Sequence, residues 1–273
     1  MCPDSASVAK IQEVIDRLLG PGGCPWDQKQ TPKSLCDYIV EEAFELVSAI
    51  RADDADETCE ELGDVLFLLL FQATLASRAG QFSLQDVVAR NAAKMIRRHP
   101  HVFGDTVVAD QEELLRNWER IKRGEKKDNG KEGGPAGTFD SLPEGLPPLL
   151  KAYRIHSKAA RNGFTWESDA DARAQYEAEL REFEAACEGP EGDRKAERME
   201  EEYGDLLFTL VELGRRKGIK ANAALDRANI KFLARYARME EMARERGLEL
   251  MDMGLDDKNR LWDEAKAAAE KEK

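Results

Sequence analysis

The chain has 273 residues, of which 54 are acidic and 41 are basic, and its formal net charge at pH 7 is −13. This length allows one large domain or two small ones, each with a buried core. Because so acidic a chain has no bulk attraction for polyanions, we expect neither nucleic acid nor an anionic membrane as a partner. The five cysteines form no CxxC pair and are odd in number, which favours a reducing, cytoplasmic location. No signal peptide is recognisable, and the apolar run at 65–71 is too short to span a bilayer.

Helical periodicity dominates the first half, and strand signals are nearly absent. Thr31 followed by Pro32 predicts the start of one helix. Asp53 or Asp54 predicts the N-cap of the next helix, whose run at 65–71 is apolar all round. Such a helix is expected at the centre of a bundle or at an oligomer interface.

Further helices are predicted on both sides of a break. Ser83 with Asp86 caps a helix that ends before Pro100, and another helix follows Asp110. Residues 124–148 are polar, rich in Gly and without periodicity, which predicts a linker. Periodicity resumes at 149, and later helices are expected at 171–187, 194–217, 221–246 and 256–271.

Two pairs of carboxylates form the most informative pattern. Glu42 and Glu45 lie three residues apart, as do Glu61 and Asp64, so each pair shares one helix face. If the two helices pack side by side, four carboxylates crowd into one space, and a divalent cation relieves their repulsion. Oxygen-only ligands suit Mg²⁺ or Mn²⁺ and argue against zinc. The alternative is a pair of solvated acidic faces with no ion.

The second half repeats the first in order, with nearly constant offsets. Glu61 and Asp64 correspond to Glu202 and Asp205 at an offset of 141, inside the similar strings ELGDVLF and EYGDLLF. The remaining pairs are Trp26 with Trp166, Glu42 with Glu179, Glu45 with Glu182, Lys94 with Lys231, Arg98 with Arg235, Trp118 with Trp262, and Lys122 with Lys266. One match would be noise, but this ordered series indicates an internal duplication. We therefore expect an all-α protein of two tandem helical-bundle domains, at 1–123 and 149–273.

The ordered motifs resemble a known family. EExxE followed by ExxD is similar to the signature of the all-α NTP pyrophosphohydrolases. The strings CPWD at 24–27, RRHPHVF at 97–103 and NGFTW at 162–166 resemble the two-domain MazG family. The resemblance covers nearly the whole chain and is weakest in the linker. It implies hydrolysis of nucleoside triphosphates to monophosphate and pyrophosphate, with broad base tolerance, by a homodimer.

The resemblance also suggests a role for each residue. A metal held by the carboxylates would neutralise phosphate charge and orient water, and Glu41 or Glu42 would accept its proton. The expected metal ligands are Glu42, Glu45, Glu61, Asp64, Glu179, Glu182, Glu202 and Asp205. Glu179 is also an expected catalytic residue. Cations and tryptophans are expected to bind the nucleotide: Lys94, Arg98, Lys122, Lys231, Arg235, Lys266, Trp26, Trp118, Trp166 and Trp262. The expected catalytic residues also include four of these cations: Lys94, Arg98, Lys231 and Arg235. A basic helix end and core tryptophans are the alternatives for these groups.

Three questions stay open in the sequence. The position that matches Glu41 is Ala178, yet the metal-binding pattern survives in both halves, so either could be active. None of the histidines, His99, His101 and His156, follows a Glu at three residues, which disfavours a ferritin-like di-iron site. A nucleotide sensor without turnover and a narrower dUTP or dCTP pyrophosphatase are the rival functions.

Overall fold

The computed structural model describes residues 5–110, 113–114, 117–118, 120–121, 124–125, 137–190, 192 and 194–271. All regular elements among these residues are helical, which confirms the all-α prediction. The chain divides into two compact units, Met1–Asp128 (unit 1) and Asn129–Lys273 (unit 2). No helix in the described ranges is long and apolar enough to cross a membrane.

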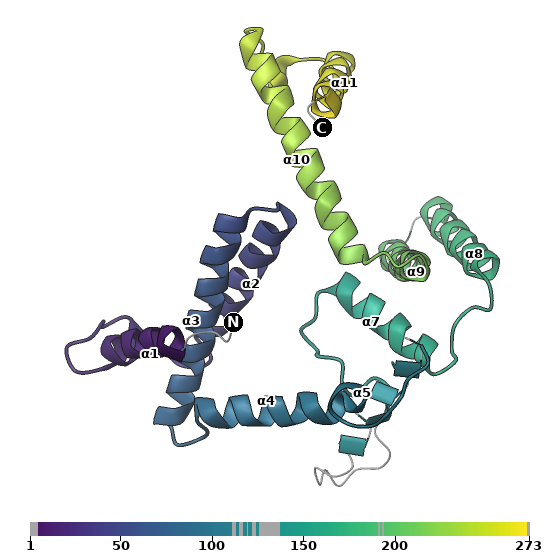
Figure 1. The fold of residues 1–273 in the computed structure, drawn as a ribbon. Helices are drawn as coiled ribbons and strands as arrows, with labels where there is room; N and C mark the ends of the chain where they lie inside the picture. Colours follow the sequence, from purple (N-terminus) through teal and green to yellow (C-terminus); the bar gives the residue numbers. More distant parts are fainter. Residues whose placement is uncertain are drawn as a thin grey trace. The chain divides into compact units, whose positions relative to one another are not determined.

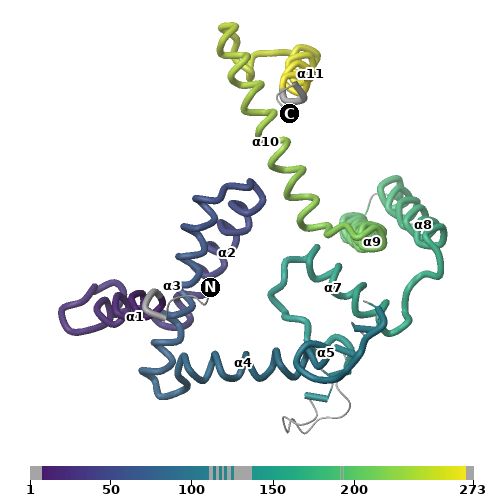
Figure 2. The backbone as a smooth tube through the Cα atoms, in the orientation of Figure 1, coloured from purple at the N-terminus to yellow at the C-terminus, as the bar shows by residue number. Residues whose placement is uncertain are grey.

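Unit 1 is built on an antiparallel pair of helices, α2 (Cys36–Arg51) and α3 (Ala55–Arg78), as Figure 1 shows. Helix α1 (Ser5–Leu19) packs across α3 and is followed by the 3-10 turn η1 (Asp27–Lys29). Helices α4 (Leu84–Arg98) and α5 (Pro100–Phe103) follow, and the described residues between 113 and 125 are helical as well. In the tube of Figure 2, α4 leads away from the far end of α3 instead of folding back along it.

The core of unit 1 lies where α1 crosses α3. Ile15 from α1 and Phe71 from α3 are almost fully buried, together with Leu35 from the turn before α2. Each such side chain contributes about 1.5–3 kcal/mol by leaving water. Leu69 on the same apolar run is 52% exposed, so only part of that run is covered within the unit.

Three of the four caps predicted in unit 1 are present, including Asp110, whose side chain accepts the Glu113 N–H at 2.7 Å. The Asp54 side chain accepts hydrogen bonds from the first turn of α3, and Ser83 with Asp86 forms a full capping box on α4. The predicted start of α2 at Thr31 is wrong. Thr31 instead opens a turn in which its hydroxyl accepts the Ser34 N–H at 3.1 Å, and α2 begins at Cys36.

Unit 2 packs α8 (Asp169–Glu188) antiparallel to α9 (Lys195–Arg216), with α7 (Pro148–Arg161) on the other side of α9 (Figure 1). Helix α10 (Ala221–Glu245) follows and packs mainly against α11 (Leu255–Lys271), with the 3-10 turn η2 (Leu250–Asp252) between them. The α10–α11 pair has its own core around Met239 and Leu261. These helices begin and end within a few residues of the predicted ranges.

Of the segment expected to link the domains, 124–148, the structure describes residues 124–125 and 137–148. The first pair belongs to unit 1 and the longer part to unit 2. There the Thr138 carbonyl accepts a hydrogen bond from the buried Lys158 of α7 at 3.3 Å.

Candidate metal centres and nucleotide sites

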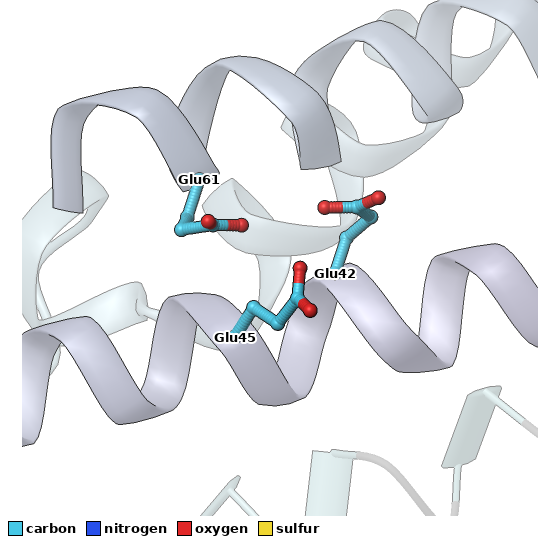
Figure 3. Close-up of side chains that lie close together, drawn as sticks. All are labelled: Glu42, Glu45 and Glu61. Atoms are coloured by element: carbon cyan, nitrogen blue, oxygen red, sulfur yellow. The ribbon is translucent and has the colours of Figure 1, made fainter. Parts of the chain in front are cut away.

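The first acidic cluster lies between α2 and α3 of unit 1. Glu42 and Glu45 from α2 face Glu61 from α3, and their closest carboxylate oxygens all lie within 4.8 Å of one another (Figure 3). We call these three residues cluster 1. Because helix faces repeat at three and four residues, packing α2 on α3 brings the three carboxylates together without any loop.

Cluster 1 is electrostatically frustrated. Burial raises the pKa of Glu42 above its usual value, and the charges of Asp64, Glu45 and Glu41 raise it further. Burial and the neighbouring Glu45 and Glu42 charges also raise the pKa of Glu61. Glu61 is only 8% exposed, and no hydrogen-bond partner meets its Oε2 among the described residues. A buried carboxylate oxygen without a donor is costly, so the cluster fits a divalent cation that prefers oxygen ligands.

The fourth predicted ligand of unit 1, Asp64, lies just outside the tight group. It is exposed on α3, yet its charge acts on both Glu42 and Glu61. It is therefore close enough to contribute to the field at an ion, whereas cluster 1 supplies the nearest oxygens.

The second acidic cluster forms between α8 and α9 of unit 2. Glu179 faces Glu202 and Asp205, again with oxygens within 4.8 Å of one another. We call these residues cluster 2. The structure leaves the predicted ligand Glu182 out of this group, exposed on α8.

The acids of cluster 2 have a neutral hydrogen-bond donor and a cation beside them. Gln175 donates a hydrogen bond to Glu179 at 2.8 Å, and the Arg198 guanidinium lies 3.9 Å from Glu202. A neutral donor and a nearby positive charge offset part of the repulsion within the cluster. Neither residue was predicted from the sequence, although both lie four residues before their partners, which is the spacing of neighbours on a helix face.

The predicted cations of unit 1 are not brought to cluster 1. Lys94 and Arg98 lie near the end of α4, which leads away from α3. The Arg98 guanidinium instead donates to Glu125 at 3.0 Å and lies 5.6 Å from the centre of the Trp118 ring. Lys122 lies outside the described residues.

The cations of unit 2 are also remote from the acids along the chain. Lys231 and Arg235 lie ten and fourteen residues into α10, about 15–21 Å along its axis. Only the start of α10 approaches α9. Lys231 and Lys266 are exposed, whereas Arg235 is half-buried.

The four tryptophans occupy different surroundings. Trp262 packs on Phe232 with ring centres 5.0 Å apart, in a cavity of about 290 Å³ between α10 and α11. Trp26 is 53% exposed and meets Tyr38 edge-on at 5.9 Å. Trp166 lies in the loop before α8, beside the buried His156 at 6.2 Å.

Comparison with known proteins agrees with this geometry. A family model described as the MazG nucleotide pyrophosphohydrolase domain matches residues 30–103, which include cluster 1. The chain is 35% identical to the nucleoside triphosphate pyrophosphohydrolase of Escherichia coli K12 over 260 residues, covering 95% of this chain and 97% of that protein. It is 36% identical over 261 residues to the nucleoside triphosphate pyrophosphohydrolase/pyrophosphatase MazG of Thermotoga maritima, covering 96% of each. The chain is also 42% identical over 258 residues to the uncharacterized protein YabN of Bacillus subtilis. That match covers 94% of this chain but only 51% of YabN, which is the longer protein. The chain belongs to the MazG family of nucleotide pyrophosphohydrolases.

Proposed function

We propose that this protein hydrolyses nucleoside triphosphates to monophosphates and pyrophosphate at its metal-loaded acidic clusters. The observation that carries the proposal is cluster 1, in which three carboxylates converge and one buried oxygen of Glu61 finds no donor in the part of the chain that the structure describes. Mg²⁺ is the proposed ion, and Mn²⁺ is the alternative, because both prefer oxygen ligands. Membership of a hydrolase family supports the same chemistry.

The bound ion would neutralise phosphate charge and lower the pKa of a coordinated water. The protein's own residues would orient the triphosphate and take up the proton of the attacking water. Glu42 is held inside cluster 1, whereas Glu41 is exposed beside it, so the geometry favours Glu42 as the proton acceptor. Because such chemistry depends on positioning and electrostatics, it needs no nucleophilic Ser or Cys.

A homodimer would bring the distant cations to the clusters. The α2–α3 pair presents Val40, Phe44, Leu62 and Leu69 at 52–54% exposure, an apolar face that a second copy would cover. Helices α4 and α10 each carry their basic residues away from the acidic cluster of their own unit, where a second copy would meet them. We therefore propose that Lys94, Arg98, Lys231 and Arg235 bind phosphates in the dimer.

Complementation tests the shared site. Two inactive variants, Glu202→Gln and Arg235→Gln, would be co-expressed with different tags and purified through both. Recovery of turnover in the mixed dimer is the expected result, because one interface then holds an intact set of residues. A mixed dimer as inactive as its parents would contradict sharing between copies.

A substrate panel with product analysis tests the function itself. The protein would be incubated with the common ribo- and deoxyribonucleoside triphosphates, with Mg²⁺, with Mn²⁺ and with chelator. We expect monophosphate and pyrophosphate from many bases, because the metal and cations contact the shared triphosphate. Turnover of dUTP or dCTP alone would indicate the narrower pyrophosphatase, and binding without any product would indicate a sensor. We place the protein in the cytoplasm, where these nucleotides are found.

A further inference from the structure

The basic end of α4 is paired with a carboxylate of its own unit. Arg97 and Arg98 are consecutive, and both donate hydrogen bonds to Glu125, which lies among the helical residues after α5. Arg97 reaches Oε1 of this carboxylate at 2.7 Å, and Nε of Arg98 reaches Oε2 at 3.0 Å, so both oxygens are engaged. The side chains of Arg98 and Glu125 are only 15% and 12% exposed. This pair is therefore shielded from water, unlike an ordinary surface ion pair.

The surroundings hold the Arg98 guanidinium in a fixed place. The Trp118 ring centre lies 5.6 Å from it, a distance suited to a cation–π contact. Trp118 and Glu125 are both helical and seven residues apart, so the ring and the carboxylate share one helix face. Arg98 and Trp118 also line a cavity of about 380 Å³. There is therefore room beside the guanidinium for an anion larger than a carboxylate.

Two adjacent guanidinium groups on one carboxylate are also a donor set for phosphate. The N–H fork of arginine matches the oxygens of carboxylates and phosphates alike. Hydrogen bonds from Arg98, with help from Arg97, outweigh burial and hold the pKa of Glu125 below its usual value, so the carboxylate is charged at neutral pH. One carboxylate balances only one of the two cations, and the pair therefore still attracts an anion of higher charge.

The internal repeat differs between the two units at these positions. Arg98 and Trp118 have counterparts in unit 2, at offsets of 137 and 144. The same offsets place alanines where unit 1 has Arg97 and Glu125, namely Ala234 and Ala269. The second arginine and the carboxylate thus occur together in unit 1 and are replaced together in unit 2. The arrangement of two arginines on one carboxylate cannot form at the matching positions of unit 2.

We propose that Glu125 is an internal competitor that keeps phosphate-bearing ligands from the Arg97–Arg98 pair. The inference rests on the proposed function, in which Arg98 binds phosphate, and it adds a residue that regulates this binding in unit 1. Because Glu125 belongs to the same chain, its effective concentration is high, on the order of millimolar for a short tether. A triphosphate must displace it, so the apparent affinity falls with the fraction of time that the site is open. Unit 1 would then keep its metal but take up triphosphate less readily than unit 2.

The test measures binding of inorganic triphosphate with Mg²⁺ to the full chain by calorimetry. All proteins carry Glu202→Gln, which removes a carboxylate of cluster 2 and weakens binding at unit 2. Glu125→Gln removes the charge but keeps the size of the side chain, and Glu125→Ala removes the competitor altogether. The double variant Glu125→Gln/Arg98→Gln also removes the cation that is expected to bind the phosphate.

Glu212→Gln is the matched control, because it removes one charge from another buried Arg–Glu pair. The Glu212 side chain is 1% exposed and accepts hydrogen bonds from Arg215 at 2.8 Å and from the Thr165 hydroxyl at 3.3 Å. Together with His156 it forms the polar floor of a cavity of about 440 Å³ between α7 and α9. At the offset of 141 its position corresponds to Phe71. Breaking this pair in unit 2 leaves the cations of α4 in place.

We expect both Glu125 variants to tighten triphosphate binding about ten-fold or more, since a site that is open about a tenth of the time binds ten-fold more weakly than one that is always open. Glu212→Gln should bind like the Glu202→Gln parent, and the double variant should lose the gain. The proposal is overturned if both Glu125 variants bind triphosphate no more tightly than the parent. It is also overturned if the gain survives in the double variant or appears equally in Glu212→Gln. Because the test needs no turnover, a failure of the unsubstituted chain to release pyrophosphate would refute the proposed function separately.

Discussion

The two acidic clusters occupy equivalent places in the duplicated halves but differ in their surroundings. Cluster 1 concentrates negative charge. No described residue donates to the buried Oε2 of Glu61, and Asp64 and Glu41 add to the negative field. Cluster 2 has Gln175 and Arg198 beside its acids. We infer that the higher density of negative charge at cluster 1 favours tighter binding of a metal ion there than at cluster 2.

We infer from this difference that the duplication has separated two requirements of one reaction. The position of Phe71 and Glu212 illustrates the change, since the same place on the helix serves the apolar core in unit 1 and a polar cavity floor in unit 2. On this account unit 1 binds metal tightly, and unit 2 carries most of the nucleotide turnover.

The largest expected effect comes from removing one carboxylate from each cluster. Glu202→Gln should lower the rate of pyrophosphate release by at least about 100-fold, because even the outer partners of metal ligands cost 10–100-fold when they are lost. Glu61→Gln, the equivalent change in unit 1, should leave most of the turnover. Steady-state assays with Mg²⁺ measure both. The reverse ranking would place turnover in unit 1 and contradict the division of roles.

The next prediction concerns metal affinity at the duplicated positions Glu45 and Glu182. Glu45→Gln should weaken Mn²⁺ binding to unit 1 by about 10–100-fold, because it removes an oxygen ligand from cluster 1. Glu182→Gln should leave Mn²⁺ binding unchanged, because this side chain lies outside cluster 2. Calorimetric titration with Mn²⁺ in the absence of nucleotide measures the metal affinity of both variants. An equal loss in Glu182→Gln would show that this side chain joins cluster 2 when the ion binds.

A third prediction follows from the raised pKa values of Glu42 and Glu61. Between the ordinary value of 4.5 and the raised values, the folded protein holds protons that the unfolded chain has released. Their contribution to the free energy of unfolding therefore falls as the pH rises through this window. Metal competes with these protons, so Mn²⁺ should raise the melting temperature more at pH 7 than at pH 5.

Scanning calorimetry of the wild type and Glu61→Gln checks this prediction, since the variant removes one of the two groups. The difference in melting temperature between the two proteins without metal should shift in favour of the variant as the pH rises. A difference that is independent of pH would show that cluster 1 is not frustrated in the folded protein.

The smallest expected effect would make cluster 2 more like cluster 1. Arg198→Gln removes the positive charge 3.9 Å from Glu202, and it should tighten Mn²⁺ binding to unit 2. Because the Arg198 side chain is largely exposed, solvent screens its charge, and the gain in Mn²⁺ affinity should not exceed about five-fold. Arg194→Gln, on the same helix but paired with Glu197, is the matched control and should change nothing. Weaker binding in Arg198→Gln would contradict the proposed neutralising role.

Much of the architecture could be predicted from local rules. The helix pattern, the caps at Asp54 and Ser83, and the meeting of Glu42, Glu45 and Glu61 all follow from spacing along helices. The predicted helix start at Thr31 was wrong because a threonine before a proline can also open a turn. The turn contains the buried Leu35, and α2 begins only at Cys36.

The sequence could not show which side chains join a group through tertiary packing. Glu182 matches Glu45 in spacing, yet the way α8 meets α9 leaves it outside cluster 2. His156, Thr165 and Glu212 come from two helices and a loop, and no periodicity links them. Their one signal in the sequence was the polar residue at 212 where the duplicate has Phe71.

The measurement that tests the central claim most directly follows the products formed from ATP. Wild type and the double variant Glu61→Gln/Glu202→Gln would be compared by ³¹P NMR, with Mg²⁺ and with chelator. The account predicts AMP and pyrophosphate from the wild type with Mg²⁺, and a loss of both products with chelator or in the double variant. Unchanged turnover in the double variant, or ADP and phosphate as the products, would contradict it.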